Sequence, residues 1–159
     1  MAVSVRYARP DDRAFMTALG ETSSAETISP LRPAPAHAAA AAFRKLLTYC
    51  DERPANVMLI GELDGKRAGM SIIVFDLLDE VTQREQAFVA YMAVAPEHRR
   101  RGVARALLAA AEEEARRRGL SHISLMVTEA SEPARALYAQ AGFSDERVLM
   151  TKPIPKAAR

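Results

Sequence analysis

Apolar and polar positions change their spacing several times along the chain, and each change predicts an element. Val3–Ala8 alternates apolar and polar residues, as a half-buried strand does. Ala36–Glu52 and Gly102–Gly119 place apolar residues at helical spacing. The second stretch also carries glutamates four residues before arginines, which supports a helix. The pattern therefore predicts one strand near the start and two long helices.

The middle of the chain predicts a hairpin followed by a buried strand. The apolar stretches Asn56–Leu63 and Arg67–Leu78 flank Asp64-Gly65, a pair that tight hairpin turns prefer. Ala87–Pro96 is nearly all apolar, which is typical of a strand covered on both faces. Three neighbouring strands are therefore expected here.

The C-terminal third predicts a strand, a helix and a closing strand. His122–Thr128 is a strand pattern, and Ser131–Gly142 reads as a short helix with Ser131 at its N-cap. Phe143–Ile154 is predicted as a closing strand with a turn or bulge near Ser144–Glu146. This stretch completes the sheet in the predicted fold.

Helix signals are also present near the start. Pro10 and the two aspartates that follow it favour a helix start, and Gly20 favours a stop. Glu21–His37 is rich in serine, threonine and proline and is predicted as a loop. The predicted order is β-α-α-β-β-β-α-β-α-β. It indicates one α/β (α+β) domain over residues 1–159, with a mixed sheet covered by helices.

Composition narrows the function. A net charge of +2 over 159 residues argues against a general nucleic-acid-binding protein. Cys50 is the one cysteine, so no internal disulfide forms and a cytoplasmic location is expected. A single cysteine and three histidines make a zinc site improbable. We see neither a signal peptide nor an apolar run that approaches the ~20 residues of a membrane helix.

The stretch Pro96–Leu108 concentrates positive charge where a helix begins. Basic residues are mildly unfavourable at that end because the helix dipole is already positive there. The first N–H groups of a helix are unpaired, and a glycine lets an anion approach the backbone closely. The pattern therefore predicts a polyphosphate site, built from Arg99, Arg100, Arg101, Gly102, Ala104 and Arg105. Neither GxxxxGK[ST] nor GxGxxG occurs, which argues against the common nucleotide sites.

These residues resemble a known signature. Arg99–Ala104 is similar to the (Arg/Gln)-x-x-Gly-x-(Gly/Ala) motif of the GNAT superfamily, the acyl-CoA-dependent N-acyltransferases. Ala134–Phe143 resembles the family's A-x-x-L-Y-x-x-x-G-F segment, and Gly61–Met70 resembles its second hairpin. The resemblance covers roughly Val3–Met150. It implies a single mixed, mostly antiparallel sheet of six or seven strands flanked by about four helices.

The resemblance implies acetyl-CoA as cosubstrate and no metal. Backbone N–H groups from Arg100 to Ala104 would hold the pyrophosphate, and β-strand backbone at Met92 and Val94 would pair with the pantetheine arm. Ser131 stands where the family often has asparagine. The full set of implied coenzyme residues is Met92, Ala93, Val94, Arg99, Arg100, Arg101, Gly102, Val103, Ala104, Arg105, Ser131 and Tyr138.

The resemblance also implies catalytic roles. Tyr138 matches the tyrosine beside the thioester sulfur. A phenol has a pKa of ~10 and a thiol a pKa of ~8.5, so Tyr138 is mostly protonated at neutral pH and can donate a hydrogen bond or a proton to the sulfur. Val94 would supply an N–H to the oxyanion. Many relatives carry a glutamate in the strand before the turn, but Phe88–Ala95 holds no carboxylate. Glu85, at the entrance of that strand, is a candidate base, acting directly or through water. A neutral amine or a water chain to backbone groups are the alternatives.

The expected acceptor is a primary amine of a small molecule or peptide. The resemblance allows a homodimer, and neither a membrane nor a nucleic-acid partner is expected. Two other hypotheses stay open. One is a non-catalytic acyl-CoA-binding or regulatory module, which the missing strand carboxylate motivates. The other is a nucleic-acid-binding domain built on the arginine run, which fits poorly with the small net charge.

Overall fold

The computed structural model describes residues 1–158 and contains one five-stranded sheet. Its strands follow one another across the sheet in sequence order, β1-β2-β3-β4-β5. The first four pair antiparallel, whereas β5 runs parallel to β4. The strands are β1 (Val3–Tyr7), β2 (Val57–Leu63), β3 (Lys66–Val74), β4 (Ala87–Val94) and β5 (Ile123–Leu125).

Four α-helices and three 3-10 turns accompany the sheet. The helices are α1 (Arg13–Ser23), α2 (Ala36–Asp51), α3 (Val103–Arg117) and α4 (Glu132–Gln140). The turns are η1 (Pro10–Asp12), η2 (Ser24–Thr27) and η3 (Pro96–His98). The bounds of α2 and α3 lie within two residues of those that the periodicity predicts. No helix within residues 1–158 combines the length and apolar character needed to cross a bilayer.

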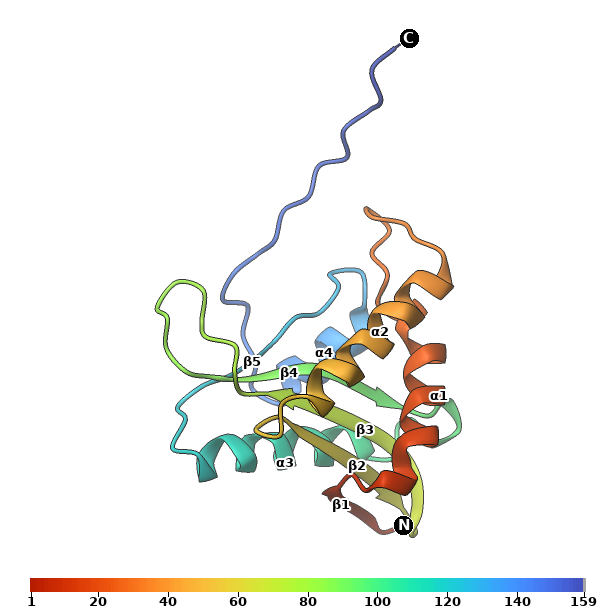
Figure 1. Cartoon of the computed structure of the whole chain (residues 1–159), viewed down its shortest axis with the longest axis vertical. Coiled ribbons are helices and arrows are strands. Elements are labelled where there is room, and N and C mark those ends of the chain that lie inside the picture. Colours follow the sequence, from red (N-terminus) through yellow and green to blue (C-terminus); the bar gives the residue numbers. More distant parts are fainter. Residues whose placement is uncertain (159) are drawn as a thin grey trace.

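The helices cover both faces of the sheet (Figure 1). On one face, Met16 of α1 and Leu47 of α2 pack with Ile72 of β3 in the first core. On the other face, Leu107 and Ala111 of α3 lie in a second core with β2, β3 and β4. The β4–α3–β5 unit therefore passes over one face and forms the predicted parallel crossover.

The sheet has five strands, not the six or seven expected. The predicted closing strand is wrong, because Phe143–Ile154 forms no strand. Its backbone pairs with no strand of the sheet, and the chain leaves the body of the molecule after α4 (Figure 1). The apolar side chains of Val148, Leu149 and Met150 are 78%, 74% and 88% exposed. An alternating apolar pattern makes a strand only where a partner strand and a covered face are available.

The predicted stop of the first helix at Gly20 is also wrong, since α1 continues to Ser23 and η2 extends the helical path to Thr27. A Cβ atom at Gly20 would lie 1.9 Å from Cε1 of Phe43. The glycine therefore lets α2 pack closely against α1 and does not end the helix. Only the second part of the predicted loop, after Thr27, is irregular before α2 begins.

Asp12 fixes the start of α1 on the sheet. It is fully buried and accepts hydrogen bonds from Arg6 at 2.7 and 3.0 Å and from Arg67 at 2.6 Å. The backbone N–H of Arg9 donates to the same carboxylate at 2.7 Å. Hydrogen bonding by Arg6, with further help from Arg67, holds the pKa of Asp12 well below its usual range. A buried carboxylate with these partners joins β1, β3 and α1 structurally.

Candidate active site

The turn before α3 has an unusual backbone. Gly102, at the N-cap of α3, has a φ of 87°, and Arg100 has a φ of 63°. Positive φ costs a non-glycine residue free energy, so Arg100 is a strained position. Left-handed residues in such a turn bring successive N–H groups onto one concave side, which is a geometry that binds anions. The sequence predicted this turn from the arginines and the glycine.

The N–H groups of this turn are free of protein acceptors. Within residues 1–158, no backbone or side-chain acceptor bonds the N–H groups from Arg100 to Arg105, and the first bond joins Ala106 N–H to the Gly102 carbonyl at 3.0 Å. A Cβ atom at Gly102 would meet nothing within 4 Å. The space in front of the turn is therefore open. Six N–H groups at the positive end of a 15-residue helix form an anion site.

The arginines divide into two groups. Arg100, Arg101 and Arg105 make no ion pair with any residue of the described chain, so their charges are available to an anion. Arg99 is engaged instead. Its Nε donates to the Val94 carbonyl at 3.1 Å, and its Nη2 lies 2.8 Å from a carboxylate oxygen of Glu26. Arg99 therefore shapes the turn rather than pointing at the open space.

Strands β4 and β5 part beside this turn. They pair only from Ala87 to Val89, opposite Ile123 to Leu125, while β4 continues to Val94. The β3–β4 register also shifts at this point, because Ile73 pairs with Val89 and Ile72 with Tyr91. The extra residue, Ala90, is a β-bulge, and bulges bend the strand that carries them. We call the gap that starts at Ala90 the β4–β5 opening.

The backbone of β4 is directed into this opening at alternate residues. The N–H of Ala95 bonds to the Ala68 carbonyl of the β3 chain at 2.8 Å. In an antiparallel pair, neighbouring residues point their N–H and C=O groups in opposite directions. Val94 and Met92 therefore point theirs away from β3 and into the β4–β5 opening. The Val94 carbonyl is taken by Arg99, which leaves its N–H to a ligand.

Tyr138 lies half-buried on α4, with its ring edge-on to Phe143 at a centroid distance of 5.9 Å. Its hydroxyl hydrogen-bonds to no described residue. Burial raises the pKa of Tyr138 above the ordinary value of 10, so the phenol stays protonated at neutral pH. Ser131 is the N-cap residue of α4, as the sequence predicts, but its hydroxyl makes no capping hydrogen bond. Both hydroxyls are thus free of protein partners.

Glu85 is exposed on the loop that enters β4, where it forms an isolated antiparallel bridge with Leu78. The opening starts at Ala90, five residues further along. A strand rises about 3.3 Å per residue, so these two positions are roughly 17 Å apart along the chain. The structure therefore sets Glu85 apart from the residues that line the opening.

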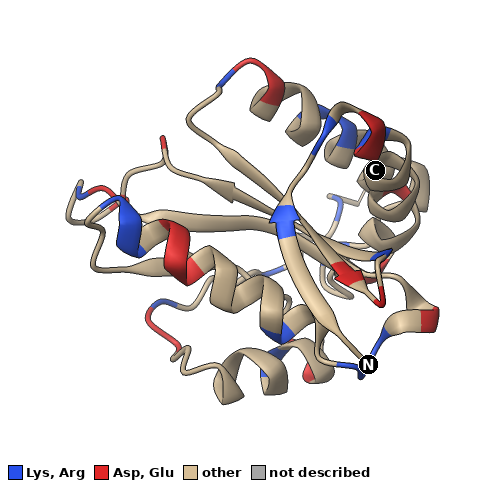
Figure 2. Ribbon diagram, turned by 90° about the horizontal axis from the view of Figure 1, so that it is seen from below, with Lys and Arg blue, Asp and Glu red and all other residues tan. Residues whose placement is uncertain are grey.

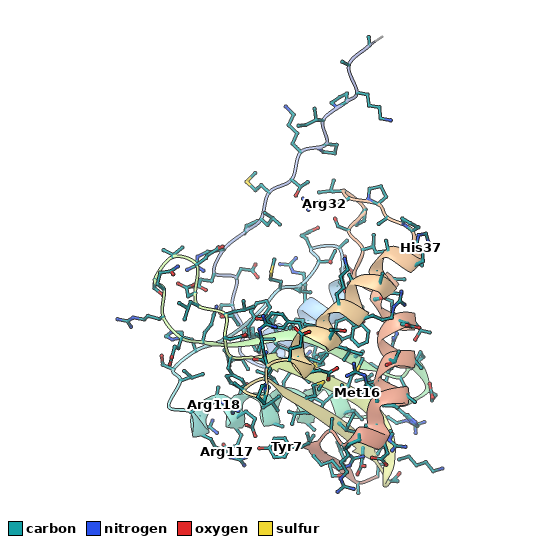
Figure 3. The ribbon with its side chains drawn as sticks, viewed as in Figure 1. Tyr7, Met16, Arg32, His37, Arg117 and Arg118 are labelled. Atoms are coloured by element: carbon teal, nitrogen blue, oxygen red, sulfur yellow. The ribbon has the colours of Figure 1, made fainter. Side chains whose placement is uncertain are left out.

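The second arginine run provides a contrast. Arg117 and Arg118 bond to Glu114 at 3.1 and 2.6 Å, and Arg118 stacks over the Phe75 ring at 3.9 Å. Arg117 also donates to the Tyr7 hydroxyl at 3.3 Å, and Figure 3 shows these residues together beside the end of α3. Acidic and basic segments are interspersed over the ribbon (Figure 2). These arginines are therefore engaged in contacts within the fold, in agreement with the glutamate–arginine spacing of the sequence.

Three polar residues near the opening make contacts that the sequence does not predict, although Tyr91 and the segment Glu21–His37, which contains Glu26, are expected from the sequence to take part in substrate recognition. The Tyr91 hydroxyl lies 2.8 Å from Ser23 Oγ, and burial raises the pKa of Tyr91. Glu26 pairs with Arg99, and Thr128 Oγ1 donates to the Thr27 carbonyl at 2.7 Å. These contacts join residues far apart in the chain, so no local pattern announces them.

Comparisons with known proteins identify the family of this chain. The model of the acetyltransferase (GNAT) family matches residues 23–143. The mycothiol acetyltransferase of Clavibacter sepedonicus is 35% identical over 95 residues, which are 60% of this chain and 29% of that protein. The chain therefore spans less than a third of the length of that relative.

Two solved structures share the fold. A GCN5-related N-acetyltransferase from Ralstonia eutropha JMP134 superposes with a TM-score of 0.72 and 25% identity, over 96% of this chain and 99% of that one. AAC(6')-Iy in complex with the bisubstrate analog CoA-S-monomethyl-acetylneamine gives 0.68 and 18%, over 98% and 100% of the two chains. Since the family model covers most of the chain, from the end of α1 to Phe143, this protein belongs to the acetyltransferase (GNAT) family.

Proposed function

We propose that this protein is an N-acetyltransferase that moves an acetyl group from acetyl-CoA to a primary amine of a small molecule or peptide. The amine attacks the thioester directly, with both substrates bound. One observation carries the proposal: six free N–H groups at the start of α3 lie at the end of β4, beside the β4–β5 opening. This arrangement suits a ligand with a polyphosphate head and a long arm.

The head of the coenzyme binds at the turn. The N–H groups of Arg100 to Arg105 hold the pyrophosphate oxygens, and the α3 dipole adds favourable potential. Arg100, Arg101 and Arg105 supply full charges, one of which reaches the 3′-phosphate. Val103 and Ala104 contribute through their backbone, and Ala104 keeps the approach free of bulk. Arg99 acts indirectly, by fixing the turn.

The arm of the coenzyme enters the β4–β5 opening. Met92 and Val94 direct backbone groups into it and pair with the pantetheine amides, while Ala93 turns towards the core on the other side. Ser131, whose hydroxyl makes no cap bond, contacts the arm from the start of α4. The thioester carbonyl then lies near the Val94 N–H, which stabilises the oxyanion that forms on attack.

The proton balance assigns the remaining roles. The amine nitrogen forms a bond to the carbonyl carbon, and the tetrahedral intermediate then loses the carbon–sulfur bond. The Tyr138 hydroxyl, which its raised pKa keeps protonated, donates a hydrogen bond or its proton to the departing sulfur, and a proton given in this way is replaced from solvent. The proton released by the amine passes to water. Because Glu85 lies roughly 17 Å along the chain from the start of the opening, a proton reaches it only through a chain of waters. The alternative is an amine that arrives neutral, with solvent as the proton acceptor.

Some of the acidic residues near the entrance of β4 are already paired. Asp79 accepts a hydrogen bond from Arg147 at 2.7 Å, and Asp76 accepts one from Tyr49 at 2.7 Å and pairs with Arg53 at 3.2 Å. The negative charge of Asp76 and Asp79 is therefore partly neutralised by residues of the protein itself. Glu80 and Glu85 form no ion pair within residues 1–158, so they are the acidic residues at this entrance whose charge would attract a cationic amine.

Release of free coenzyme thiol tests the catalytic claim against the non-catalytic alternative. The protein is incubated with acetyl-CoA and a panel of primary amines, and free thiol is followed with a thiol-reactive dye. We expect steady release with at least one amine, above the rate without protein, and acetylated amine in equal amount by mass spectrometry. Saturable acetyl-CoA binding without release for any amine would instead establish a coenzyme-binding module.

A further inference from the structure

The 3-10 turn η2, residues 24–27, contacts both of the strand ends that diverge. We call this segment the strap. It follows directly from α1, whose last residue, Ser23, is held against β4 by the hydrogen bond to Tyr91 at 2.8 Å. The Tyr91 ring also packs on Phe43 of α2 at a centroid distance of 4.7 Å. The strap therefore begins next to Ser23, a residue that is held against Tyr91, and Tyr91 directly follows the bulge at Ala90 in β4.

The strap is tied to the end of β4 through Arg99. Glu26 lies 2.8 Å from Nη2 of Arg99, and Nε of the same guanidinium donates to the Val94 carbonyl at 3.1 Å. Val94 is the last residue of β4 and one of the two that point backbone groups into the β4–β5 opening. Arg99, the first residue of the coenzyme signature, thus links the strap to the end of β4 at the β4–β5 opening.

The strap is tied to the chain beyond β5 through Thr128. The Thr128 hydroxyl donates to the Thr27 carbonyl at 2.7 Å, three residues after β5 ends at Leu125. The Thr128 carbonyl in turn accepts the N–H of Ser131, at the start of α4, at 2.9 Å. A segment bonded to both diverging chains spans the gap between them, so the strap crosses the outer end of the β4–β5 opening.

The ion pair between Arg99 and Glu26 contributes little to the stability of the fold. The side chains of Arg99 and Glu26 are 41% and 58% exposed, and ion pairs at that exposure add little to folding free energy. The bonds of Glu26 and Thr27 instead hold the strap in one position relative to β4 and to the chain after β5. They hold short polar groups at the place where an arm leaving the phosphate turn has to enter the opening.

We infer that the strap holds the pantetheine arm of the coenzyme in the opening, with Glu26 and Thr128 as its positioning residues. The inference rests on the proposed function, because it assigns a further role at the same site. Arg99 holds the turn through the bond from its Nε to the Val94 carbonyl, whereas Glu26 bonds to its Nη2. The bond that fixes the turn therefore remains when the strap is loosened, so the hold on the arm weakens and the hold on the phosphates does not change.

Comparing the whole coenzyme with its nucleotide half tests the inference. Glu26→Gln removes the charge at constant size, and Thr128→Val removes the hydroxyl at nearly constant shape. The dissociation constants of coenzyme A and of 3′-phospho-ADP, which lacks pantetheine, are measured for each by calorimetry. We expect coenzyme A to bind about fivefold to tenfold more weakly, the effect of one lost hydrogen bond, and 3′-phospho-ADP to bind as in the wild type. Glu112→Gln, on α3 away from the strap, is the control and leaves both constants unchanged.

The other results would each overturn the inference. Equal weakening of both ligands means that the strap supports the phosphate turn instead, and unchanged coenzyme A binding in both variants means that the arm does not touch it. Failure of the wild type to bind coenzyme A at all is a different outcome. It removes the proposed function itself, and with it any role for the strap in holding the arm.

Discussion

Replacing Gly102 by glutamate is expected to abolish coenzyme binding, with a loss of affinity of at least about hundredfold. Two effects act together. The φ of 87° forces a non-glycine residue into a strained backbone conformation, and the new side chain starts in the open space that we propose for the pyrophosphate. Its carboxylate then takes the N–H groups of α3 for itself and repels the phosphates.

Thermal unfolding with and without acetyl-CoA measures this effect. A ligand at ~100 times its dissociation constant stabilises the folded state by about 2.7 kcal/mol, which raises the unfolding temperature by roughly 5–10 °C for a domain of this size. We expect this rise in the wild type and none in Gly102→Glu. The matched control is Gly119→Glu, at the other end of α3, where φ is 68° and the space is also open. That variant bears the same strain and should keep the full rise. The same rise in Gly102→Glu would remove the turn from the binding site.

Replacing Tyr138 by phenylalanine is expected to lower turnover by about 10²- to 10⁴-fold, the usual contribution of a general acid. The ring keeps its edge contact with Phe143, so only the hydroxyl is lost. The affinity for acetyl-CoA should stay within about twofold, because the free hydroxyl makes no bond that would hold the site together. Turnover and the dissociation constant are therefore measured on the same preparation, with Tyr49→Phe as a control that removes a hydroxyl bonded to Asp76.

The pH dependence gives this prediction a second readout. Burial raises the pKa of Tyr138 above 10, so the proton donor is present at lower pH and is lost as the pH rises through that raised pKa. Wild-type turnover should accordingly fall at high alkaline pH, and the phenylalanine variant should lack this fall. Undiminished turnover in Tyr138→Phe, or the same alkaline fall in both proteins, would exclude Tyr138 as the acid.

The parts of the site that depend on neighbouring residues could be predicted from the sequence. The arginines and the glycine before a long amphipathic stretch predict a helix start with unpaired N–H groups. The structure has such a turn before α3. The apolar stretch before this turn predicts β4, and the His122–Thr128 pattern predicts β5, although only Ile123–Leu125 pairs with β4. Local spacing determines these features, so a local pattern reveals them.

The contacts of the site that depend on residues distant in the sequence could not be predicted. Glu26 lies 73 residues from Arg99, and Thr27 lies 101 residues from Thr128, so nothing in either neighbourhood indicates their bonds. The local pattern predicts a helix stop at Gly20, but a glycine is required there because the ring of Phe43, on another helix, occupies the space of a Cβ atom. Residues 143–154 have the composition of a strand, but their backbone pairs with no strand, and β5, the edge strand at that end of the sheet, has only three residues.

A titration of the backbone amides with coenzyme A, followed by heteronuclear NMR, tests the central claim most directly. The account predicts that the largest shifts fall on the N–H groups of Arg100 to Arg105, with further shifts at Met92 and Val94, while β1, at the far edge of the sheet, stays unchanged. Shifts concentrated elsewhere, or none at saturating coenzyme A, would contradict the claim that the start of α3 and the β4–β5 opening form the coenzyme site.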